Sequence, residues 1–344
     1  MDGPRFDHLA RLTTVAGLYE HALHAAPRVE HGMCVDDAAR ALVVTARQPA
    51  PTTDVVSLSR IYLAYLLRAQ AADGVMHNRS DDAGHWLDEP SSGDHWGRSL
   101  WAFGTAAAHS PEGQVRAGGI LGAQRAMPAR SPYPRAMAYA ALGAVQLAAA
   151  VPDNLAARRL LHDARTVLAR TEPGVGRAWP FGRLTYANAV LPEAMIAIGR
   201  TLHDDALRDR GLSLLWWLAE HQTLAGHLSV VPAGGRDQDD VARGRRPGFD
   251  QQPIEVAALA EAAAEAFEAT ADRRWAVLLA RCEAWFEGDN DGRLRMRAPV
   301  GGGAYDGLED GSVNQNQGAE STLASLATAQ LARRRALVPA SAGS

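Results

Sequence analysis

A loose repeat of helical pairs constrains this fold most, because periods of roughly 40 to 65 residues mark arrays of packed helices. One helix of each pair is amphipathic, with apolar residues three to four positions apart. These helices are expected at Leu9–Ala25, Asp54–Ala72, Gly113–Arg125, Asn154–Arg170, Asp205–His221 and Asp272–Phe286. The other helix is apolar nearly all round and follows a polar cluster. These helices are expected within residues 38–46, 93–108, 131–150, 185–202, 249–267 and 314–332.

The apolar helices predict how the pairs are arranged in space. A helix that is apolar all round must be buried, so these helices should form an inner ring. An open array needs polar caps at both ends, whereas the first and last pairs here are as apolar as the middle ones. We therefore expect an all-α fold, a closed (α/α)6 toroid of six helical hairpins. It should form a single domain over residues 1–333, followed by a flexible C-terminal tail over residues 334–344.

Composition excludes several classes of function. The 344 residues carry 35 basic and 39 acidic side chains, and no basic block could follow a nucleic-acid backbone. The only cysteines, Cys34 and Cys282, make neither a disulfide framework nor a metal-binding pair, and the histidines lack zinc-ligand spacing. No apolar run reaches the ~18 residues of a membrane span, and no signal sequence is evident. We expect a cytoplasmic protein with no cofactor, no metal, no membrane contact and no nucleic-acid partner.

Polar clusters precede the inner helices, and they should meet at one end of the ring because those helices all run the same way. In CVDDAARAL, either Asp36 or Asp37 would suffice to cap a helix. The other carboxylate points about 100° further round the helix and could face the central cavity. Asp37 is therefore a catalytic candidate, and Asp36 is a substrate-binding candidate.

A second cluster lies in WLDEPSSGDHWGRSLWAFG, where Asp88, Glu89 and Asp94 fall within seven positions and follow Trp86. Carboxylates beside aromatic faces are typical of sugar subsites, since rings stack on a pyranose and acids bind its hydroxyls. Asp94 could instead be a helix cap that pairs with Arg98, four residues on. The cluster supplies Asp94 as a catalytic candidate and the other residues as binding candidates.

The remaining clusters supply further binding candidates: His77, His95, Arg135, Trp179, Tyr186, Asn188, Asp250, Gln251, Gln252, Glu255, Asp306, Asn314, Asn316 and Gln317. Three polar side chains directly before Pro253 exceed what capping needs. Glu320 begins an otherwise apolar helix, so its carboxylate should be poorly solvated on the inner face. Poor solvation would raise its pKa, as a general acid requires.

Several strings together resemble a known family: HGMCVDDAARAL, DGVMHNRS, RLTYANAVLPEAMIAIG, FDQQPIEVAALAEA and GAYDGLEDGSVNQNQGAESTLASL. They are similar to a helical-toroid domain of bacterial carbohydrate-active proteins, often fused to or encoded near glycosyltransferases and mannoside-processing enzymes. The resemblance extends from about His8 to Leu331. It implies an (α/α)6 toroid, a carbohydrate substrate such as a mannoside, and a glycosyltransferase or mannoside-processing enzyme of the same pathway as a partner.

The leading hypothesis is an inverting glycoside hydrolase that uses Asp94 and Glu320 as its acid and base, with Asp37 as the third candidate. The preference for inversion rests on analogy with other helical toroids. One alternative is a sugar epimerase or isomerase, which would need two histidines facing each other across the cavity, from among His31, His77 and His95. The other alternative is a non-catalytic glycan-binding accessory protein.

Overall fold

The computed structural model describes residues 4–171, 178–238 and 246–337, and helices are its main secondary structure there. The inner helices are α2 (Val35–Ala46), α4 (Asp94–His109), α6 (Pro134–Ala150), α8 (Val190–Leu202), α10 (Pro253–Thr270) and α12 (Ala319–Leu337). The outer helices are α1 (Asp7–Leu12), α3 (Thr53–Ala69), α5 (Gly113–Ala126), α7 (Leu155–Ala169), α9 (Asp205–His221) and α11 (Arg273–Phe286). None of the helices in the described ranges is long and apolar enough to cross a membrane.

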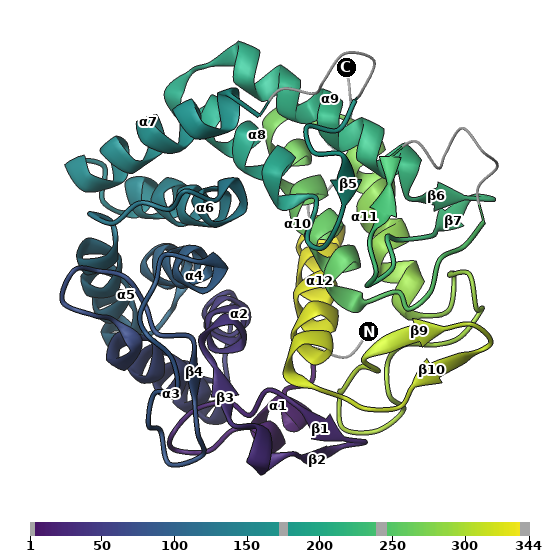
Figure 1. The fold of residues 1–344 in the computed structure, drawn as a ribbon, viewed down its shortest axis with the longest axis horizontal. Helices are drawn as coiled ribbons and strands as arrows, with labels where there is room; N and C mark the ends of the chain where they lie inside the picture. Colours follow the sequence, from purple (N-terminus) through teal and green to yellow (C-terminus); the bar gives the residue numbers. More distant parts are fainter. Residues whose placement is uncertain (1–3, 172–177, 239–245, 338–344) are drawn as a thin grey trace.

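The inner helices form a closed ring (Figure 1). Each packs against the next along the chain, and α12 packs against α2, which closes the circle. The outer helices α3, α5, α7, α9 and α11 pack on the inner helices to which they are joined, while α1 packs on α12. This arrangement confirms the all-α toroid that the repeat predicts.

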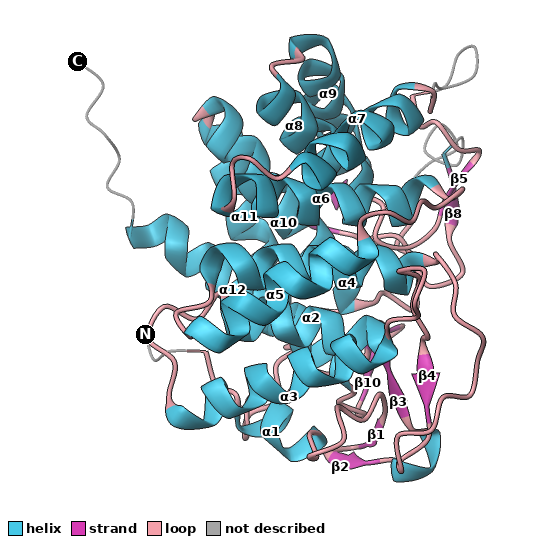
Figure 2. Ribbon diagram, turned by 90° about the vertical axis from the view of Figure 1, so that its left-hand side faces the viewer, coloured by secondary structure: helices cyan, strands magenta, loops and turns pink. Residues whose placement is uncertain are grey.

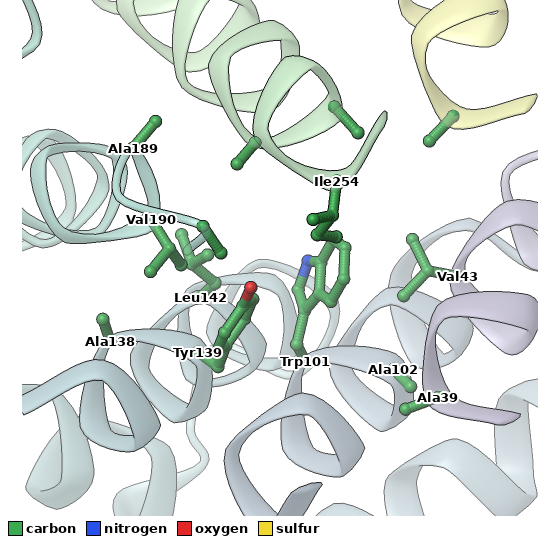
Figure 3. Close-up of a cluster of buried hydrophobic side chains, with 14 of the residues drawn as sticks. Ala39, Val43, Trp101, Ala102, Ala138, Tyr139, Leu142, Ala189, Val190 and Ile254 are labelled. Atoms are coloured by element: carbon green, nitrogen blue, oxygen red, sulfur yellow. The ribbon is translucent and has the colours of Figure 1, made fainter. Parts of the chain in front are cut away.

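The inner helices pack closely enough to fill the axis of the ring. Figure 3 shows Val43, Trp101, Tyr139, Val190 and Ile254 converging there from five different inner helices. Trp101 and Tyr139 are buried, with their ring centroids 5.8 Å apart. The axis is therefore largely filled: the cavity left among these side chains has a volume of about 40 Å³, far less than a sugar site needs, so a ligand site is expected at an end of the ring.

The contact between α4 and α6 depends on glycine. A Cβ atom at Gly97 would lie 2.2 Å from the carbonyl oxygen of Ala136, and one at Gly143 would lie 2.1 Å from that of Leu100. The two helices therefore meet backbone to backbone. This close approach positions the start of α4 beside the start of α6.

The connections at one end of the ring contain short antiparallel strands and a 3-10 turn, η1 (Val29–His31). Five strand pairs occur in the described ranges: β1 (Ala22–Leu23) with β2 (Ala26–Pro27), β3 (Met33–Cys34) with β4 (Arg79–Ser80), β5 (Arg183–Leu184) with β8 (Arg236–Asp237), β6 (Thr223–Leu224) with β7 (His227–Leu228), and β9 (Gly307–Glu309) with β10 (Ser312–Asn314). Figure 2 shows most of these strands on one side of the helical layer, opposite the chain termini.

Two expected boundaries differ from the structure. The first helix was expected to reach Ala25, but it ends at Leu12, because Thr13 is extended and its hydroxyl donates to the carbonyl of Leu9. The chain then forms turns and the β1–β2 hairpin. At the other end, α12 continues to Leu337, past the expected start of the C-terminal tail, and residues 338–344 of that tail lie outside the described residues.

Candidate functional site

Two joined cavities open where the inner helices begin. The smaller, which we call the carboxylate cavity, has a volume of about 440 Å³ and is lined by Glu20, His21, Cys34, Asp36, Asp37, Arg40, Arg98, Tyr186, Asp250, Gln252, Asp306, Asn314, Gly318, Glu320 and Ser321. The larger, which we call the aromatic cavity, has a volume of about 910 Å³ and is lined by Asp36, Asn78, Gly93, Asp94, His95, Arg98, Tyr133, Pro134, Arg135, Trp179, Phe181, Gly182, Arg183, Thr185, Tyr186, Asn188, Leu191 and Asp237. Three residues line both: Asp36, Arg98 and Tyr186.

Helix starts account for the acidic character of these walls. Asp36 and Asp37 lie in the first turn of α2, and Glu320 lies in the first turn of α12. Asp94 is the first residue of α4, and Asp250 lies a few residues before α10. The positive end of a helix dipole stabilises a nearby carboxylate, so convergent helix starts tolerate many acids in a small volume.

Arg40 holds two carboxylates of the carboxylate cavity. Its guanidinium donates to Asp37 across 2.5 Å and forms an ion pair with Glu320 at 2.8 Å. Burial raises the pKa of Asp37 to about 7, although the charge of Arg40 opposes the rise and the charge of Glu320 adds to it. The thiol of Cys34 donates to the other carboxylate oxygen of Asp37 across 3.2 Å. Asp37 is thus fully engaged inside the protein, which suits a positioning residue.

Arg98 fixes the boundary between the two cavities. It donates to Asp36 across 2.5 Å, and its guanidinium lies 4.7 Å from the ring centroid of Tyr139 and 5.8 Å from that of Tyr186. Burial alone would raise the pKa of Asp36, but the charges of Arg98 and Arg40 outweigh burial and lower it. Asp36 therefore stays ionised at the junction of the cavities.

Asp94 lies in the aromatic cavity with its Oδ2 already occupied. The hydroxyl of Tyr186 donates to this oxygen, and the guanidinium of Arg135 lies 3.9 Å from it. Arg135 also covers the ring of Tyr186, 4.1 Å from its centroid. These contacts suit a carboxylate that orients Tyr186 and a ligand better than an acid that gives up a proton.

Asp250 is the carboxyl group of the carboxylate cavity that is least well satisfied. It is half-buried, and its Oδ1 has no hydrogen-bond donor among the described residues. A Cβ atom at Gly307 would lie 2.0 Å from this oxygen, so the carboxyl packs against bare backbone. Burial, together with the negative charges of Glu309 and Asp306, raises the pKa of Asp250 to about 6. The group can therefore carry a proton close to neutral pH.

Glu320 does not have the environment that its sequence context predicts. Its side chain is 42% exposed and pairs with Arg40, so the expectation of poor solvation is wrong. The reason is that the start of α12 lies on the wall of the cavity and not on the packed axis of the ring. Glu320 is thus better suited to accept a proton than to donate one.

Four binding candidates from the long loop after α3 line neither cavity. His77 and Trp86 stack on each other, with ring centroids 5.0 Å apart. Asp88 accepts from the backbone nitrogens of Asn78 and Arg79 across 2.7 and 3.0 Å, and Glu89 is exposed. We correct the expectation that these residues face a sugar in either cavity: the loop uses the side chains of His77, Trp86 and Asp88 to fold on itself, and Glu89 is exposed outside both cavities.

Gln251 and Glu255 are also structural in this arrangement. Gln251 is fully buried and donates to the carboxylate of Asp291 across 2.6 Å. Glu255 is buried and accepts from the backbone nitrogen of Ala187 and, across 2.9 Å, from the side chain of Asn188. Burial raises the pKa of Glu255 to about 7. Neither side chain lines a cavity, since each holds a loop that precedes an inner helix.

Asn316 and Gln317 likewise tie the start of α12 to the N-terminal segment. The side chain of Asn316 accepts from the backbone nitrogen of His24 across 2.9 Å. The backbone carbonyl of Gln317 bonds the ring of His8 across 2.8 Å. Both residues lie outside the two cavities, unlike their neighbour Asn314.

Some wall residues were missed from the sequence. Arg40 lies one turn into an otherwise apolar helix, three residues after Asp37, and this spacing could have marked it. Tyr133 directly precedes Pro134 at the start of α6, and its exposed ring could have been expected from its position before a helix. Glu20 and His21 were not found because the expected first helix, Leu9–Ala25, included them, whereas the observed helix ends at Leu12 and leaves them in the turns that follow.

No protein-family profile and no curated protein sequence matches this chain. Solved structures do match its fold. A sugar epimerase from a ruminal bacterium gives a TM-score of 0.71 at 10% identity, over 95% of both chains. A cellobiose 2-epimerase from Bacillus thermoamylovorans gives 0.70 at 9% identity, also over 95% of both. A glycoside hydrolase family 9 endoglucanase gives 0.59 at 13% identity, over 91% of this chain and 73% of that one. The chain therefore has the (α/α)6 toroid fold of these carbohydrate-active enzymes.

Proposed function

We propose that the chain is an inverting glycoside hydrolase that cleaves its substrate in the carboxylate cavity, with Asp250 as general acid and Glu320 as general base. One observation carries this proposal: the half-buried Asp250, which lacks a donor to its Oδ1, shares a cavity with Glu320, which is paired with Arg40. Two carboxyl groups with opposite protonation are what glycoside hydrolysis needs.

The proposed reaction involves two proton transfers, one from Asp250 and one to Glu320. Asp250 gives its proton to the glycosidic oxygen as the bond from that oxygen to the anomeric carbon breaks. Glu320 takes a proton from a water molecule whose oxygen bonds to the anomeric carbon. The half-exposed Glu320 then returns its proton to solvent, and Asp250 regains one from solvent.

Asp306 is a third carboxyl group in the cavity that contains Asp250 and Glu320. Its charge raises the pKa of Asp250, and the charge of Glu320 in turn raises the pKa of Asp306. Asp306 is therefore near both groups, and it is itself bonded to Ser321 across 2.5 Å. The inverting stereochemistry is proposed by analogy with other helical toroids; in inverting enzymes the acid and the base stand about 6.5–9.5 Å apart, with a water molecule between them.

The epimerase alternative finds less support among the imidazoles. His95 lines the aromatic cavity, and its Nε2 lies 3.0 Å from the carbonyl of Met76. His31 lines neither cavity and packs edge-on against His21, which lines the carboxylate cavity. His77 stacks on Trp86 in a loop. The histidines that we considered for an epimerase thus do not face each other across one cavity.

The test is hydrolysis of a panel of manno- and gluco-oligosaccharides by the parent and by Asp250→Asn and Glu320→Gln variants. Loss of a general acid or base lowers kcat by about 10²–10⁴-fold, so the kcat of each variant should be lower than that of the parent by that factor. Asp310→Asn removes a charge from an exposed turn nearby and is the matched control, which should retain parental kcat. In the parent, kcat/KM should fall as pH rises through about 6, because Asp250 must be protonated.

Product analysis separates the alternatives. Proton NMR during turnover should show the anomer opposite to that of the substrate. If both carboxylate variants cleave as fast as the parent, the assignment of acid and base is wrong. Mass-neutral conversion of a free sugar would establish the epimerase instead, and glycan binding with no turnover would establish a binding protein.

A further inference from the structure

Tyr133 occupies a position where its ring does nothing for the helix that it begins. It is the N-cap residue of α6, yet its side chain makes no cap hydrogen bond. Ser, Thr, Asp and Asn are favoured at this position because their oxygens satisfy free N–H groups. The side chain of Tyr133 is instead 61% exposed on the wall of the aromatic cavity. Its presence there calls for an explanation other than helix stability.

Two more exposed rings line the same cavity. Phe181 is 38% exposed and Tyr186 is 40% exposed. Large aromatic side chains that gather in solvent on one concave surface mark a binding site, because their exposure is otherwise unfavourable. Tyr186 is held in place by Arg135 over its ring and by its bond to Asp94. The wall is therefore partly preorganised for a ligand with flat apolar faces.

The charges of the aromatic cavity indicate that this ligand is neutral. The cavity is lined by three arginines, Arg98, Arg135 and Arg183, and by three acids, Asp36, Asp94 and Asp237, so its charges balance. Arg98 is paired with Asp36, and Arg135 lies near Asp94. The neighbouring carboxylate cavity is rich in acids and would repel an anion. A chain of neutral pyranoses fits both walls, since each ring presents an apolar face for stacking and hydroxyls for carboxylates.

The two cavities adjoin at Tyr186, Asp36 and Arg98, which line both. We infer that the aromatic cavity is a distal subsite, in which Tyr133 and Phe181 stack on sugars beyond the residue held in the carboxylate cavity. This inference rests on the proposed function for the site of cleavage. The substrate is then a neutral oligosaccharide of three or more sugars, because Tyr133 and Phe181 line the aromatic cavity and not the carboxylate cavity.

The test measures binding against chain length. Calorimetric titration of the Asp250→Asn protein with di-, tri- and tetrasaccharides of one neutral series gives each affinity without turnover. Adding Tyr133→Ala should weaken tetrasaccharide binding about two- to tenfold, the value of an aromatic contact of about 0.5–1.5 kcal/mol, and leave the disaccharide unaffected. Tyr133→Phe keeps the ring and should bind the tetrasaccharide within about twofold of the parent.

Two further variants test whether the loss of affinity is specific to the aromatic side chains of the aromatic cavity. Leu155→Ala truncates a side chain of similar exposure at the start of α7, outside both cavities, and should leave every affinity unchanged. Phe181→Ala should repeat the length-dependent loss. Equal affinities for all lengths, or equal losses for the di- and tetrasaccharide in Tyr133→Ala, would overturn the inference even if hydrolysis is observed. Length-dependent binding without hydrolysis would support it and refute the proposed hydrolase.

Discussion

Gly143 is a position at which a single added atom would meet backbone of the neighbouring inner helix. A Cβ atom there would lie 2.1 Å from the carbonyl oxygen of Leu100 and 2.7 Å from the backbone nitrogen of Trp101. Both are atoms of the α4 backbone, which cannot rotate aside as a side chain can. The Gly143→Ala substitution therefore forces α4 and α6 apart.

The magnitude follows from two opposing terms. Replacing glycine by alanine inside a helix favours the helix by about 1 kcal/mol. Overpacking a close contact costs about 1–3 kcal/mol, and a clash with backbone belongs at the upper end of that range. We expect Gly143→Ala to lower the free energy of unfolding by about 2 kcal/mol. Because α4 and α6 begin at the aromatic cavity, the same shift should weaken ligand binding there.

Equilibrium unfolding in urea, followed by circular dichroism, measures this change. Gly118→Ala in α5 is the matched control, since the three atoms nearest to its Cβ all belong to the side chain of Leu63, the closest at 2.5 Å, and that side chain can move. The control should differ from the parent by no more than about 1 kcal/mol. If Gly143→Ala unfolds at the same urea concentration as the parent, the backbone contact between α4 and α6 does not exist as described.

Two further predictions concern binding candidates that the structure makes structural. Burial raises the pKa of Glu255 from 4.5 to about 7, a shift worth about 3 kcal/mol. The parent should therefore lose stability as pH rises from 4.5 to 7. The Tm of Glu255→Gln should rise relative to that of the parent between pH 5 and pH 8. A difference in Tm between variant and parent that stays the same across this pH range would contradict the prediction. Gln251→Ala removes a hydrogen-bond donor from the buried Asp291, so it should lower the free energy of unfolding by about 1–3 kcal/mol and leave KM unchanged. A raised KM at the parental Tm would instead show that Gln251 binds the substrate.

The sequence predicted the ring because its strongest signal is physical. A helix apolar on every side can only be buried, and six of them with matching partners leave few arrangements besides a closed circle. Asp205–His221 was expected as a helix and matches α9. The length of the first helix was overestimated because apolar residues continue at helical spacing after Leu12. Spacing alone does not register that the hydroxyl of Thr13 bonds the last turn and that the backbone turns extended there.

The site was predictable only where it depends on helix starts. Asp36, Asp37, Asp94 and Glu320 were expected near one end of the ring, and each lines at least one of the two adjoining cavities. The proton affinity of Asp250 could not be predicted, because it depends on packing against Gly307 from a distant hairpin. Loop residues such as Asp88 were misjudged for a related reason. A polar side chain in a loop bonds the nearest free backbone groups, and the sequence does not show which groups are nearest.

The ion pair between Arg40 and Glu320 joins α2 to α12, so it could serve either ring closure or chemistry. An ion pair with one partner 42% exposed contributes at most about 1 kcal/mol, because solvent screens it. Leu323 and Ala324 are buried along the same side of α12, and the side chain of Gln330 donates to the carbonyl of Val44 across 2.9 Å. These contacts close the ring without Glu320. A loss of turnover in Glu320→Gln would therefore report on chemistry and not on unfolding.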